Sequence, residues 1–452
     1  MRALGQPELA IRTFATYYEQ LRAGATGLLP EADIEPVTGL PDADTDLGDH
    51  HAAGQAALPH TVVIKLNGGL GTGMGMTRAK SLLPVKDGLS FLDLVARQLA
   101  ALHNASGAHV PLLLMDSFRT REDSLAALAR YPELDAGLPL DFLQHQVPKV
   151  LVDGLAPADG DDDVAWCPPG HGDLYTALVT SGTLARLRER GFRWAFVSNA
   201  DNLGATVDLG ILGYLADRGL PFLMEVADRT EADKKGGHLA RRRAGGLVLR
   251  ESAQCAPEDA EAFQDWRRHA YFNTNNLWVD LDALAALLDA RDGVLGLPLI
   301  RNRKTLDPVD PASPAVYQLE TAMGAAIEVF EGAGAVRVSR ARFAPVKATS
   351  DLLALWSDAY VRDAGERVAL APERAGAPVI VDLDPRFYKL IGDLERRFPH
   401  GAPSLLGCRH LTVRGDVTFG AGVVCVGDAR VEAPDGEALR VPDGARLGAS
   451  TP

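Results

Sequence analysis

Residues 62–83 read VVIKLNGGLGTGMGMTRAKSLL, and this stretch decides the fold. Residues 62–64 are an apolar run typical of a buried strand, and the glycine-rich run 68–75 follows. Lys80 then stands where the pattern predicts that a helix opens. Glycines let the backbone turn and approach a ligand closely, and the N–H groups of such a loop attract anions. The order of strand, glycine loop and lysine therefore predicts a phosphate-binding site.

Two familiar nucleotide motifs do not fit this loop. A P-loop has a glycine directly before its Lys-Ser pair and another glycine earlier, but Ala79 precedes Lys80 and Met74 occupies the earlier position. The dinucleotide fingerprint would place its third glycine on Met76 or Met74, depending on the starting glycine. The segment is therefore either a nucleotide loop of another kind or an ordinary glycine-rich turn.

The loop resembles the nucleotide-binding loop of the UTP–glucose-1-phosphate uridylyltransferases, also called UDP-glucose pyrophosphorylases. Further segments resemble the same family in the same order: FLQ at 142–144, WCPPGHGD at 166–173, SNADNLGAT at 198–206, FNTNNLW at 272–278, QLETA at 318–322 and PVKATSDLL at 345–353. The resemblance covers roughly residues 60–430. Any one segment would be a weak match, but six in order are specific.

Length and charge limit the classes of function. A chain of 452 residues with 46% apolar residues is long and apolar enough for two or three globular domains. Its net charge of -14 argues against nucleic acid as the main partner, because duplex binding favours a basic face. The negative average does not exclude a small anionic substrate, because a few lysines in a cleft can override it locally.

Lysine is rare in this chain. Only nine of its 46 basic residues are lysines, so 37 are arginines. Six of the nine lie in or beside the segments that carry the argument: Lys65, Lys80, Lys149, Lys234, Lys235 and Lys347. A compact ammonium group suits a crowded phosphate site better than a broad guanidinium, so these lysines are candidates for phosphate contacts.

The cysteines and the N-terminal residues bear on the compartment. The four cysteines, Cys167, Cys255, Cys408 and Cys425, form no C-x-x-C pair, which argues against a zinc site. The first residues lack the apolar region of a signal peptide, and no apolar run approaches membrane-spanning length. These features predict a cytoplasmic protein with reduced thiols and no membrane partner.

The middle of the chain alternates predicted strands and helices. The N-terminal segment 1–57 combines an amphipathic helix near 8–24 with an irregular stretch at 28–58. Strands are predicted at 61–65, 110–115, 194–198, 221–225 and 277–279, and helices near 90–104, 122–130, 174–190, 207–217 and 281–289. This alternation predicts an α/β fold with a largely parallel sheet, whose ligands bind beyond the carboxyl ends of the strands.

The sequence pattern changes after about residue 400. Between 411 and 427, short apolar steps recur about every six residues and are broken by Gly or Asp. This spacing favours the coils of a β-helix, with a plain β-meander as the alternative. The family resemblance implies a left-handed β-helix at 386–452, which mediates assembly in some members. It also implies that 58–385 is a Rossmann-like, GT-A-like nucleotidyltransferase domain with a mixed, mainly parallel sheet.

The resemblance implies a magnesium-dependent reaction in which glucose 1-phosphate attacks the α-phosphorus of UTP and expels pyrophosphate. Such a transfer depends on positioning and electrostatics, so lysines and one metal carboxylate are expected in place of a protein nucleophile. By resemblance, Lys80 contacts the triphosphate, Lys347 bridges the two phosphates and Asp201 binds Mg²⁺. The alternatives are a surface lysine for Lys80, a salt bridge to Asp351 for Lys347, and a helix cap near 207 for Asp201.

The remaining site residues follow from the same resemblance. For UTP they are Leu66, Asn67, Gly68, Gly69, Lys80, Gln144, Gly170, Asn199 and Lys347. For glucose 1-phosphate they are His171, Asn199, Asp201, Gly236, Glu251 and Asn275. Gln144 offers the donor and acceptor that a uracil edge requires, although a surface glutamine would also fit this position. A lone histidine such as His171 is more often structural, but this one is flanked by glycines.

Two local departures separate the chain from the eukaryotic branch of the family. Arg78-Ala79 replaces Gly-Pro before the loop lysine, and Lys149 replaces an arginine. Together with a shorter N-terminus, these changes suggest a bacterial branch and leave the choice of sugar less secure. Three rival functions follow: a uridylyltransferase for galactose 1-phosphate or N-acetylglucosamine 1-phosphate, a nucleotide-binding regulator without turnover, and a P-loop kinase, which Met74 and Ala79 oppose.

Overall fold

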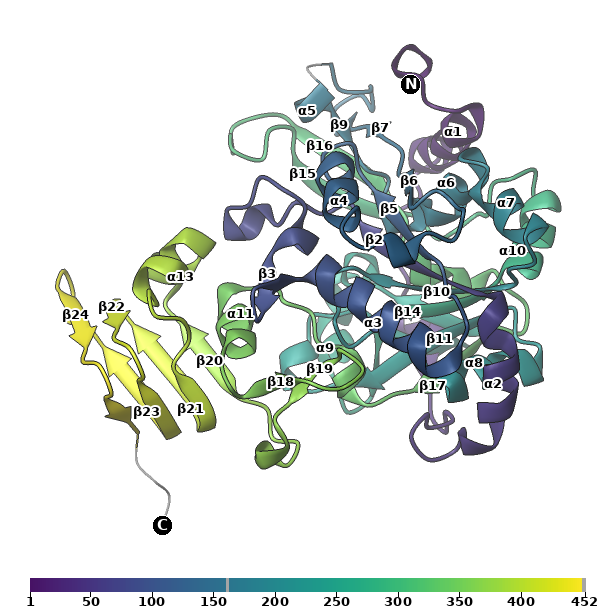
Figure 1. Cartoon of the computed structure of the whole chain (residues 1–452). Coiled ribbons are helices and arrows are strands. Elements are labelled where there is room, and N and C mark those ends of the chain that lie inside the picture. Colours follow the sequence, from purple (N-terminus) through teal and green to yellow (C-terminus); the bar gives the residue numbers. More distant parts are fainter. Residues whose placement is uncertain (160–161, 449–452) are drawn as a thin grey trace.

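The computed structural model describes residues 1–159 and 162–448 and has a mixed sheet at its centre (Figure 1). The strands run in the order β1 (Ile34–Pro36), β12 (His238–Arg242), β14 (Tyr271–Asp280), β10 (Trp194–Asn199), β2 (Thr61–Asn67), β5 (Leu112–Asp116) and β6 (Asp141–Leu143). Three further strands extend this sheet: β11 (Phe222–Asp228) pairs with β14, β17 (Gly334–Arg337) pairs with β11, and β13 (Leu247–Arg250) pairs with β12. The strands β10, β2, β5 and β6 are parallel, whereas β14 is antiparallel to β10 and β11. The predicted α/β class, with a parallel sheet around the first strand, is confirmed.

Helices cover both faces of the sheet. Those packed on its two faces include α2 (His51–Ala57), α3 (Phe91–Ser106), α6 (Leu174–Thr180), α7 (Thr183–Glu189), α8 (Leu209–Arg218) and α10 (Leu281–Asp289). The other helices are α1 (Glu8–Arg22), α4 (Arg121–Leu128), α5 (Asp162–Ala165) and α9 (Ala260–Gln264), together with α11 (Thr349–Trp356), α12 (Pro385–Tyr388) and α13 (Ile391–Arg397), which pack with the C-terminal strands. Within 1–159 and 162–448, no helix is both long and apolar enough to span a bilayer.

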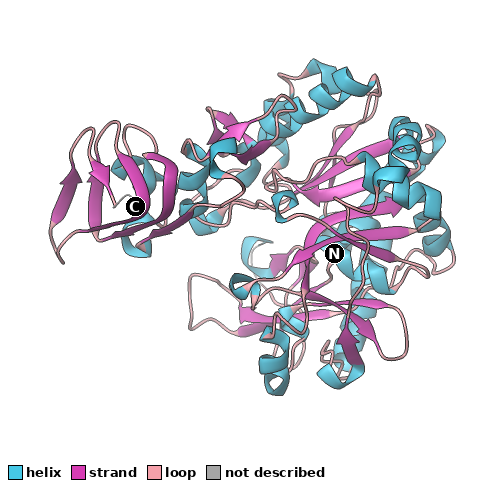
Figure 2. Ribbon diagram, turned by 90° about the horizontal axis from the view of Figure 1, so that it is seen from below, coloured by secondary structure: helices cyan, strands magenta, loops and turns pink. Residues whose placement is uncertain are grey.

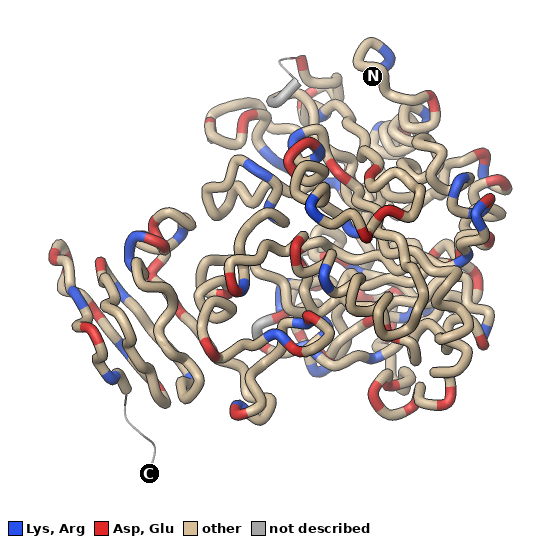
Figure 3. The backbone as a smooth tube through the Cα atoms, viewed as in Figure 1, with Lys and Arg blue, Asp and Glu red and all other residues tan. Residues whose placement is uncertain are grey.

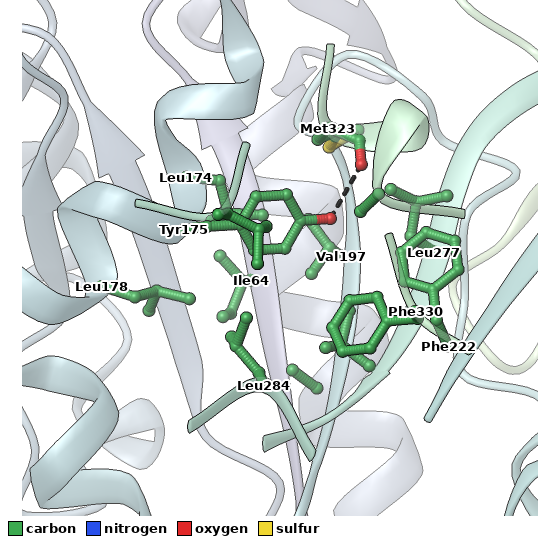
Figure 4. Close-up of a cluster of buried hydrophobic side chains, with 14 of the residues drawn as sticks. Ile64, Leu174, Tyr175, Leu178, Val197, Phe222, Leu277, Leu284, Met323 and Phe330 are labelled. Atoms are coloured by element: carbon green, nitrogen blue, oxygen red, sulfur yellow. Dashed lines mark hydrogen bonds between the residues drawn. The ribbon is translucent and has the colours of Figure 1, made fainter. Parts of the chain in front are cut away.

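Alternation along the strands supplies two cores. Val62 and Ile64 pack with α6, α7 and α10, whereas Val63 packs with α2, α3 and α8 on the opposite face. Successive side chains of a strand point to opposite faces, so an uninterrupted apolar run belongs to a strand that is covered on both sides. Figure 4 shows the first of these cores, where Tyr175 lies among Ile64, Val197 and Leu277.

Local sequence explains where several elements begin and end. Ser90 caps α3, because its backbone N–H donates to the Asp93 carboxylate at 2.9 Å and its Oγ accepts from the Asp93 N–H at 3.2 Å. The predicted helix 174–190 is two helices, α6 and α7, because Gly182 between them is left-handed at φ 71°. The predicted irregular stretch 28–58 contains β1 and α2.

The predicted helix after the glycine loop is wrong. Residues Lys80–Leu82 form only a short 3-10 turn, and the hairpin β3 (Pro84–Lys86) and β4 (Leu89–Ser90) follows before α3 begins. Leu83 is extended at ψ 125° because it precedes Pro84, whose ring disfavours the helical conformation of the residue before it. Lys80 therefore enters the site without the dipole of a long helix behind it.

The C-terminal strands form a separate unit beside the main sheet (Figure 2). Strands β20 (Ile380–Leu383), β21 (Ser404–Arg414), β23 (Val424–Glu432) and β25 (Arg446–Leu447) are parallel neighbours, as are β22 (Asp416–Phe419) and β24 (Ala438–Val441). Leu411 pairs with Ala429, which lies 18 residues later in the chain. This separation equals three of the predicted six-residue steps. Neighbours in a meander are antiparallel, so the meander alternative is wrong.

Charges on this unit are paired between strands and within them. Arg409 pairs with Asp428 across β21 and β23, and Arg430 pairs with Glu432 along β23. Figure 3 shows acidic and basic positions interspersed along these strands and over the larger part of the chain.

The remaining strands form small sheets at the margins. They are β15 (Ile300–Thr305), β16 (Ala315–Glu320) and β8 (Val150–Leu151) in one sheet, β7 (Val147–Pro148) with β9 (Trp166–Cys167), and β18 (Tyr360–Arg362) with β19 (Val368–Leu370). The division of the chain at 57/58 and at 385/386 stays a prediction.

Candidate functional site

A cavity of about 340 Å³ lies where the parallel strands β2, β5, β6 and β10 end. Its lining consists of Leu66, Asn67, Gly68, Gly69, Lys80, Ser81, Met115, Gln144, Pro168, Gly170, His171, Asn199, Ala200 and Asp201. Ten of these are residues that the sequence predicted. The position agrees with the rule that open α/β sheets bind ligands beyond the carboxyl ends of their strands. Ser81, Met115, Pro168 and Ala200 were not predicted: Ser81, Pro168 and Ala200 lie within matching segments, whereas Met115 had only a predicted strand to point to it.

Lys80 and Asp201 meet at the wall of this cavity. The Lys80 Nζ donates to Asp201 Oδ2 at 2.5 Å, although the two residues are 121 positions apart in the chain. Both side chains are partly buried, with exposed fractions of 18% and 23%. Burial of this degree reduces screening by water, so the pair places a cation and an anion where phosphate oxygens would enter.

The Asp201 carboxylate fits a magnesium ligand. It lines the cavity and keeps some exposure, and Mg²⁺ favours one or two carboxylates together with phosphate oxygens and water. In the part of the chain that the structure describes, no group of three or more His, Cys, Asp and Glu side chains could hold a metal. The alternative role as a helix cap belongs to Asp208, which accepts from the Ile211 N–H at 3.0 Å and caps α8.

The Gln144 side-chain amide packs against the backbone of Gly68 on the cavity wall. A Cβ at Gly68 would lie 2.8 Å from Gln144 Nε2 and 2.9 Å from its Oε1. The backbone N–H of Gln144 donates to the Asp116 carbonyl at 2.9 Å, which fixes it at the end of β5. The Asn67 side chain instead donates to Asp116 Oδ1 at 2.6 Å in the core, so it holds strand ends together and leaves only its backbone for the cavity.

His171 enters the cavity as a neutral donor. Its Nδ1 accepts the Met323 backbone N–H at 3.0 Å, so the ring proton lies on Nε2. Burial lowers the pKa of His171 to about 4, which keeps the ring uncharged at neutral pH. The Met323 carbonyl in turn accepts the Tyr175 hydroxyl at 2.8 Å, as Figure 4 shows, so the histidine is fixed to the core.

Gly170 is required by its surroundings. Its φ is +80°, and a Cβ would lie 2.4 Å from the carbonyl oxygen of Thr321. Thr321 is fixed in turn, because its N–H donates to Pro169 and its carbonyl accepts from Gly172. A side chain at position 170 would therefore push the turn that carries His171 away from the cavity.

Replacing Gly170 with alanine should lower the free energy of unfolding by about 2–4 kcal/mol, since left-handed strain and a backbone clash add. Gly191→Ala is the matched control, because Gly191 has φ +81° but, among the described residues, no neighbour within 4 Å of its Cβ position. That control should cost only about 1 kcal/mol. Denaturant unfolding of both variants measures the difference, and equal losses would remove the Thr321 contact as the cause.

Lys347 lies outside the cavity lining but close to it in the fold. Asn202, next to Asp201, forms an antiparallel bridge with Pro345, two residues before Lys347. The Lys347 side chain is exposed, and its Nζ lies 5.4 Å from the Phe343 ring centre. The Asp351 carboxylate accepts the backbone N–H of Lys347 at 2.7 Å, so Asp351 caps α11 and leaves the ammonium group for other partners.

The three predicted sugar residues Gly236, Glu251 and Asn275 do not line the cavity. Asn275 lies on β14 with a left-handed backbone (φ 60°), and its Oδ1 accepts from the Asn273 side-chain amide at 2.8 Å. Burial raises the pKa of Glu251, whose carboxylate lies beside Gly237. Gly236 is exposed.

A buried polar network supports the loop that carries Asp201. Lys65 donates to Ser198 Oγ at 2.7 Å and to the Ala205 carbonyl at 2.9 Å, so it joins the two ends of this loop. Burial lowers the pKa of Lys65 to about 7. The rarity of lysine had singled out this residue without giving its role. Nearby, the Glu225 carboxylate accepts two hydrogen bonds from Arg342, each at 2.7 Å.

Known proteins resemble this chain over most of its length. The profile of the family described as UTP–glucose-1-phosphate uridylyltransferase matches residues 12–425. The UTP–glucose-1-phosphate uridylyltransferase of Solanum tuberosum is 42% identical over 405 residues, covering 88% of this chain and 82% of the relative. That of Saccharomyces cerevisiae is 41% identical over 393 residues, covering 86% and 77%.

A solved structure agrees with these relatives. A mutant of UDP-glucose pyrophosphorylase from Leishmania major, in complex with UDP-glucose, superimposes with a TM-score of 0.91 at 47% identity, covering 99% of this chain and 96% of that one. These relatives are eukaryotic, so the expected bacterial branch is not borne out. That expectation rested partly on Arg78 and Ala79. In the structure Ala79 is buried, and the Arg78 Nε lies 3.7 Å from the Asp123 Oδ2.

Proposed function

The chain belongs to the UTP–glucose-1-phosphate uridylyltransferase family, and from that premise we propose how its cavity carries out the family's reaction. The enzyme converts UTP and glucose 1-phosphate into UDP-glucose and pyrophosphate. A phosphate oxygen of the sugar phosphate attacks the α-phosphorus of UTP in line, a new O–P bond forms, and the bond from the α-phosphorus to the bridging oxygen of pyrophosphate breaks. The observation that carries the mechanism is the Lys80–Asp201 pair at the ends of the parallel strands.

Two lysines supply positive charge in this proposal. Lys80 binds the triphosphate, which is supported by its place on the cavity wall and its N–H bond to the Gly69 carbonyl at 3.0 Å. Lys347 bridges the sugar phosphate and the α-phosphate. Its support is an exposed ammonium group on the segment that pairs with Asn202. Both act on charge that is redistributed as pyrophosphate leaves.

Asp201 would hold Mg²⁺, which neutralises phosphate oxygens when it is bound. The fit rests on a cavity-facing carboxylate that is paired with Lys80. Lys80 donates to the same carboxylate, so its ammonium group would lie beside the phosphate oxygens that Asp201 and its metal would hold. Asp201 therefore orients Lys80 as well as providing a ligand.

The uridine lies against the glycine loop. The backbone of Leu66, Asn67, Gly68 and Gly69 faces it, with Gly170 and Asn199 completing the wall. Gln144 reads the uracil edge, because its amide offers one donor side and one acceptor side. Its amide lies against Gly68 on the cavity wall, which supports contact of both residues with the same side of the base.

Replacing Gln144 with alanine should raise the KM for UTP about tenfold or more, change kcat less, and reduce the preference for UTP over CTP, since the edge contacts would be lost. Steady-state kinetics with both nucleotides measures this. Gln146→Ala is the control, because Gln146 lies two residues on and outside the cavity lining. An unchanged KM for UTP would exclude Gln144 as a uracil-binding residue.

The sugar phosphate lies on the other side of the α-phosphate. His171 donates from Nε2 to its phosphate, and Asn199 and Asp201 adjoin it. Gly236, Glu251 and Asn275 are proposed for the hydroxyl groups on the family resemblance of their segments.

Pyrophosphate release with UTP, Mg²⁺ and a panel of sugar 1-phosphates tests the proposed function. Release with glucose 1-phosphate should far exceed that with galactose 1-phosphate or N-acetylglucosamine 1-phosphate. A different preferred sugar would keep the mechanism and overturn the assignment of the sugar residues.

We also propose the finer architecture. The sheet around β2 supports a Rossmann-like, GT-A-like catalytic domain, and the stacked parallel C-terminal strands support a left-handed β-helix. Self-association through this unit stays a prediction, and light scattering on the purified protein tests it. A cytoplasmic location is supported by the free thiols of the four cysteines.

A further inference from the structure

The Asp173 carboxylate joins two walls of the cavity from behind. Its Oδ2 accepts the backbone N–H of His145 at 2.6 Å, and its Oδ1 accepts the ring Nδ1–H of the same residue at 2.8 Å. Both side chains are almost fully buried, with exposed fractions of 5% for Asp173 and 7% for His145. A carboxylate is suited to this place, because each of its oxygens accepts and neither donates.

The two partners stand directly beside residues that line the cavity. His145 follows Gln144, and Asp173 comes two residues after His171. The turn is closed by the Asp173 N–H, which donates to the Gly170 carbonyl at 3.2 Å. One carboxylate therefore fixes the Gln144 segment to the turn that carries His171, although neither Asp173 nor His145 lines the cavity.

The imidazole ring is fixed at both ends. With the Nδ1 proton directed at Asp173, Nε2 accepts the Thr180 hydroxyl at 2.9 Å. Thr180 is the last residue of α6, and Asp173 is the residue immediately before that helix. His145 is thus clamped across the length of α6, and the backbone of Gln144 cannot shift without breaking one of these bonds.

We propose that Asp173 is a positioning residue for nucleotide recognition: through His145 it holds the Gln144 amide against Gly68 on the cavity wall, where it can meet the uracil edge. The proposal rests on the proposed role of Gln144. It assigns to the Asp173–His145 pair an effect on UTP affinity and base choice, with little effect on the chemical step.

The decisive comparison uses three variants. In Asp173→Asn the amide oxygen accepts one His145 donor while the amide N–H₂ opposes the other, so the KM for UTP should rise about tenfold with kcat within about threefold. His145→Ala removes the ring donor and should raise the Kd for UTP about as much. His145→Asn keeps a donor at the place of Nδ1 and should restore the Kd to within about twofold of the parent.

Each outcome bears on the proposal. Calorimetric UTP binding and kinetics with UTP and CTP, together with thermal unfolding, separate affinity from stability. If Asp173→Asn does not fold, the pair His145→Ala and His145→Asn carries the test alone. Equal UTP affinities for these two variants, or stability losses with unchanged affinity and base choice, would overturn the positioning role. If Gln144→Ala also leaves UTP affinity unchanged, the proposed role of Gln144 fails instead.

Discussion

Replacing Lys347 with alanine should lower kcat by about two to four orders of magnitude, because the ammonium group neutralises charge on both phosphates during transfer. The side chain is exposed, and the backbone N–H that meets Asp351 is retained in the variant. We therefore expect the folded structure and its unfolding temperature to be nearly unchanged. Single-turnover measurement of UDP-glucose formation separates this loss from any change in product release.

Lys304→Ala is the matched control for this prediction. Lys304 is also an exposed lysine, on β15, and it lies outside the cavity lining. Its loss should leave kcat within about twofold, as for most surface substitutions. Near-parental turnover in Lys347→Ala would show that Lys347 has no part in the reaction and would leave Lys80 as the proposed phosphate lysine.

Replacing Asp201 with asparagine should reduce kcat by roughly three orders of magnitude and weaken metal binding in the presence of UTP. Asparagine keeps the size of the side chain and an oxygen that can accept from Lys80, so the change removes mainly the negative charge. Mn²⁺ binding followed by electron paramagnetic resonance gives a readout that does not depend on turnover.

Asp208→Asn controls for the loss of a carboxylate near the same loop. Asp208 caps α8, and asparagine is an equally good N-cap, so both stability and metal binding should be retained. Metal affinity in Asp201→Asn equal to that of Asp208→Asn would exclude Asp201 as the ligand.

Local pattern predicted most elements of the catalytic region. The apolar run after Thr61 and the strand before Asn199 were recognised because burial on both faces leaves continuous apolar letters. The helix at 281–289 has buried residues only on one face, at 281, 284, 285 and 288. The helix predicted at Lys80 does not form because Pro84 ends the turn after three residues. The break at Gly182 was missed because a single glycine is compatible with a continuing helix. In both cases one residue overrode a longer pattern.

Many of the residues that line the cavity were predicted from family resemblance and not from local pattern. Gly68, Gln144, His171 and Asp201 were found through segments that resemble one family, and the structure brings them together at one sheet edge. Glu251 and Gly236 lie outside this cavity, and their segments matched less fully. Supporting residues such as Asp173 had no signal of their own, since a buried carboxylate and a surface carboxylate look alike in a sequence.

The sequence by itself determined the strand, the glycine loop and the scarcity of lysine, because these depend on neighbouring residues and on composition. Only the tertiary structure decided which charges meet. The Lys80–Asp201 pair, the tautomer of His171 and the double hydrogen bond from His145 to Asp173 all depend on strand order and register. Hydrogen bonds act over about 3 Å, so a contact between residues a hundred positions apart exists only once the sheet has placed both.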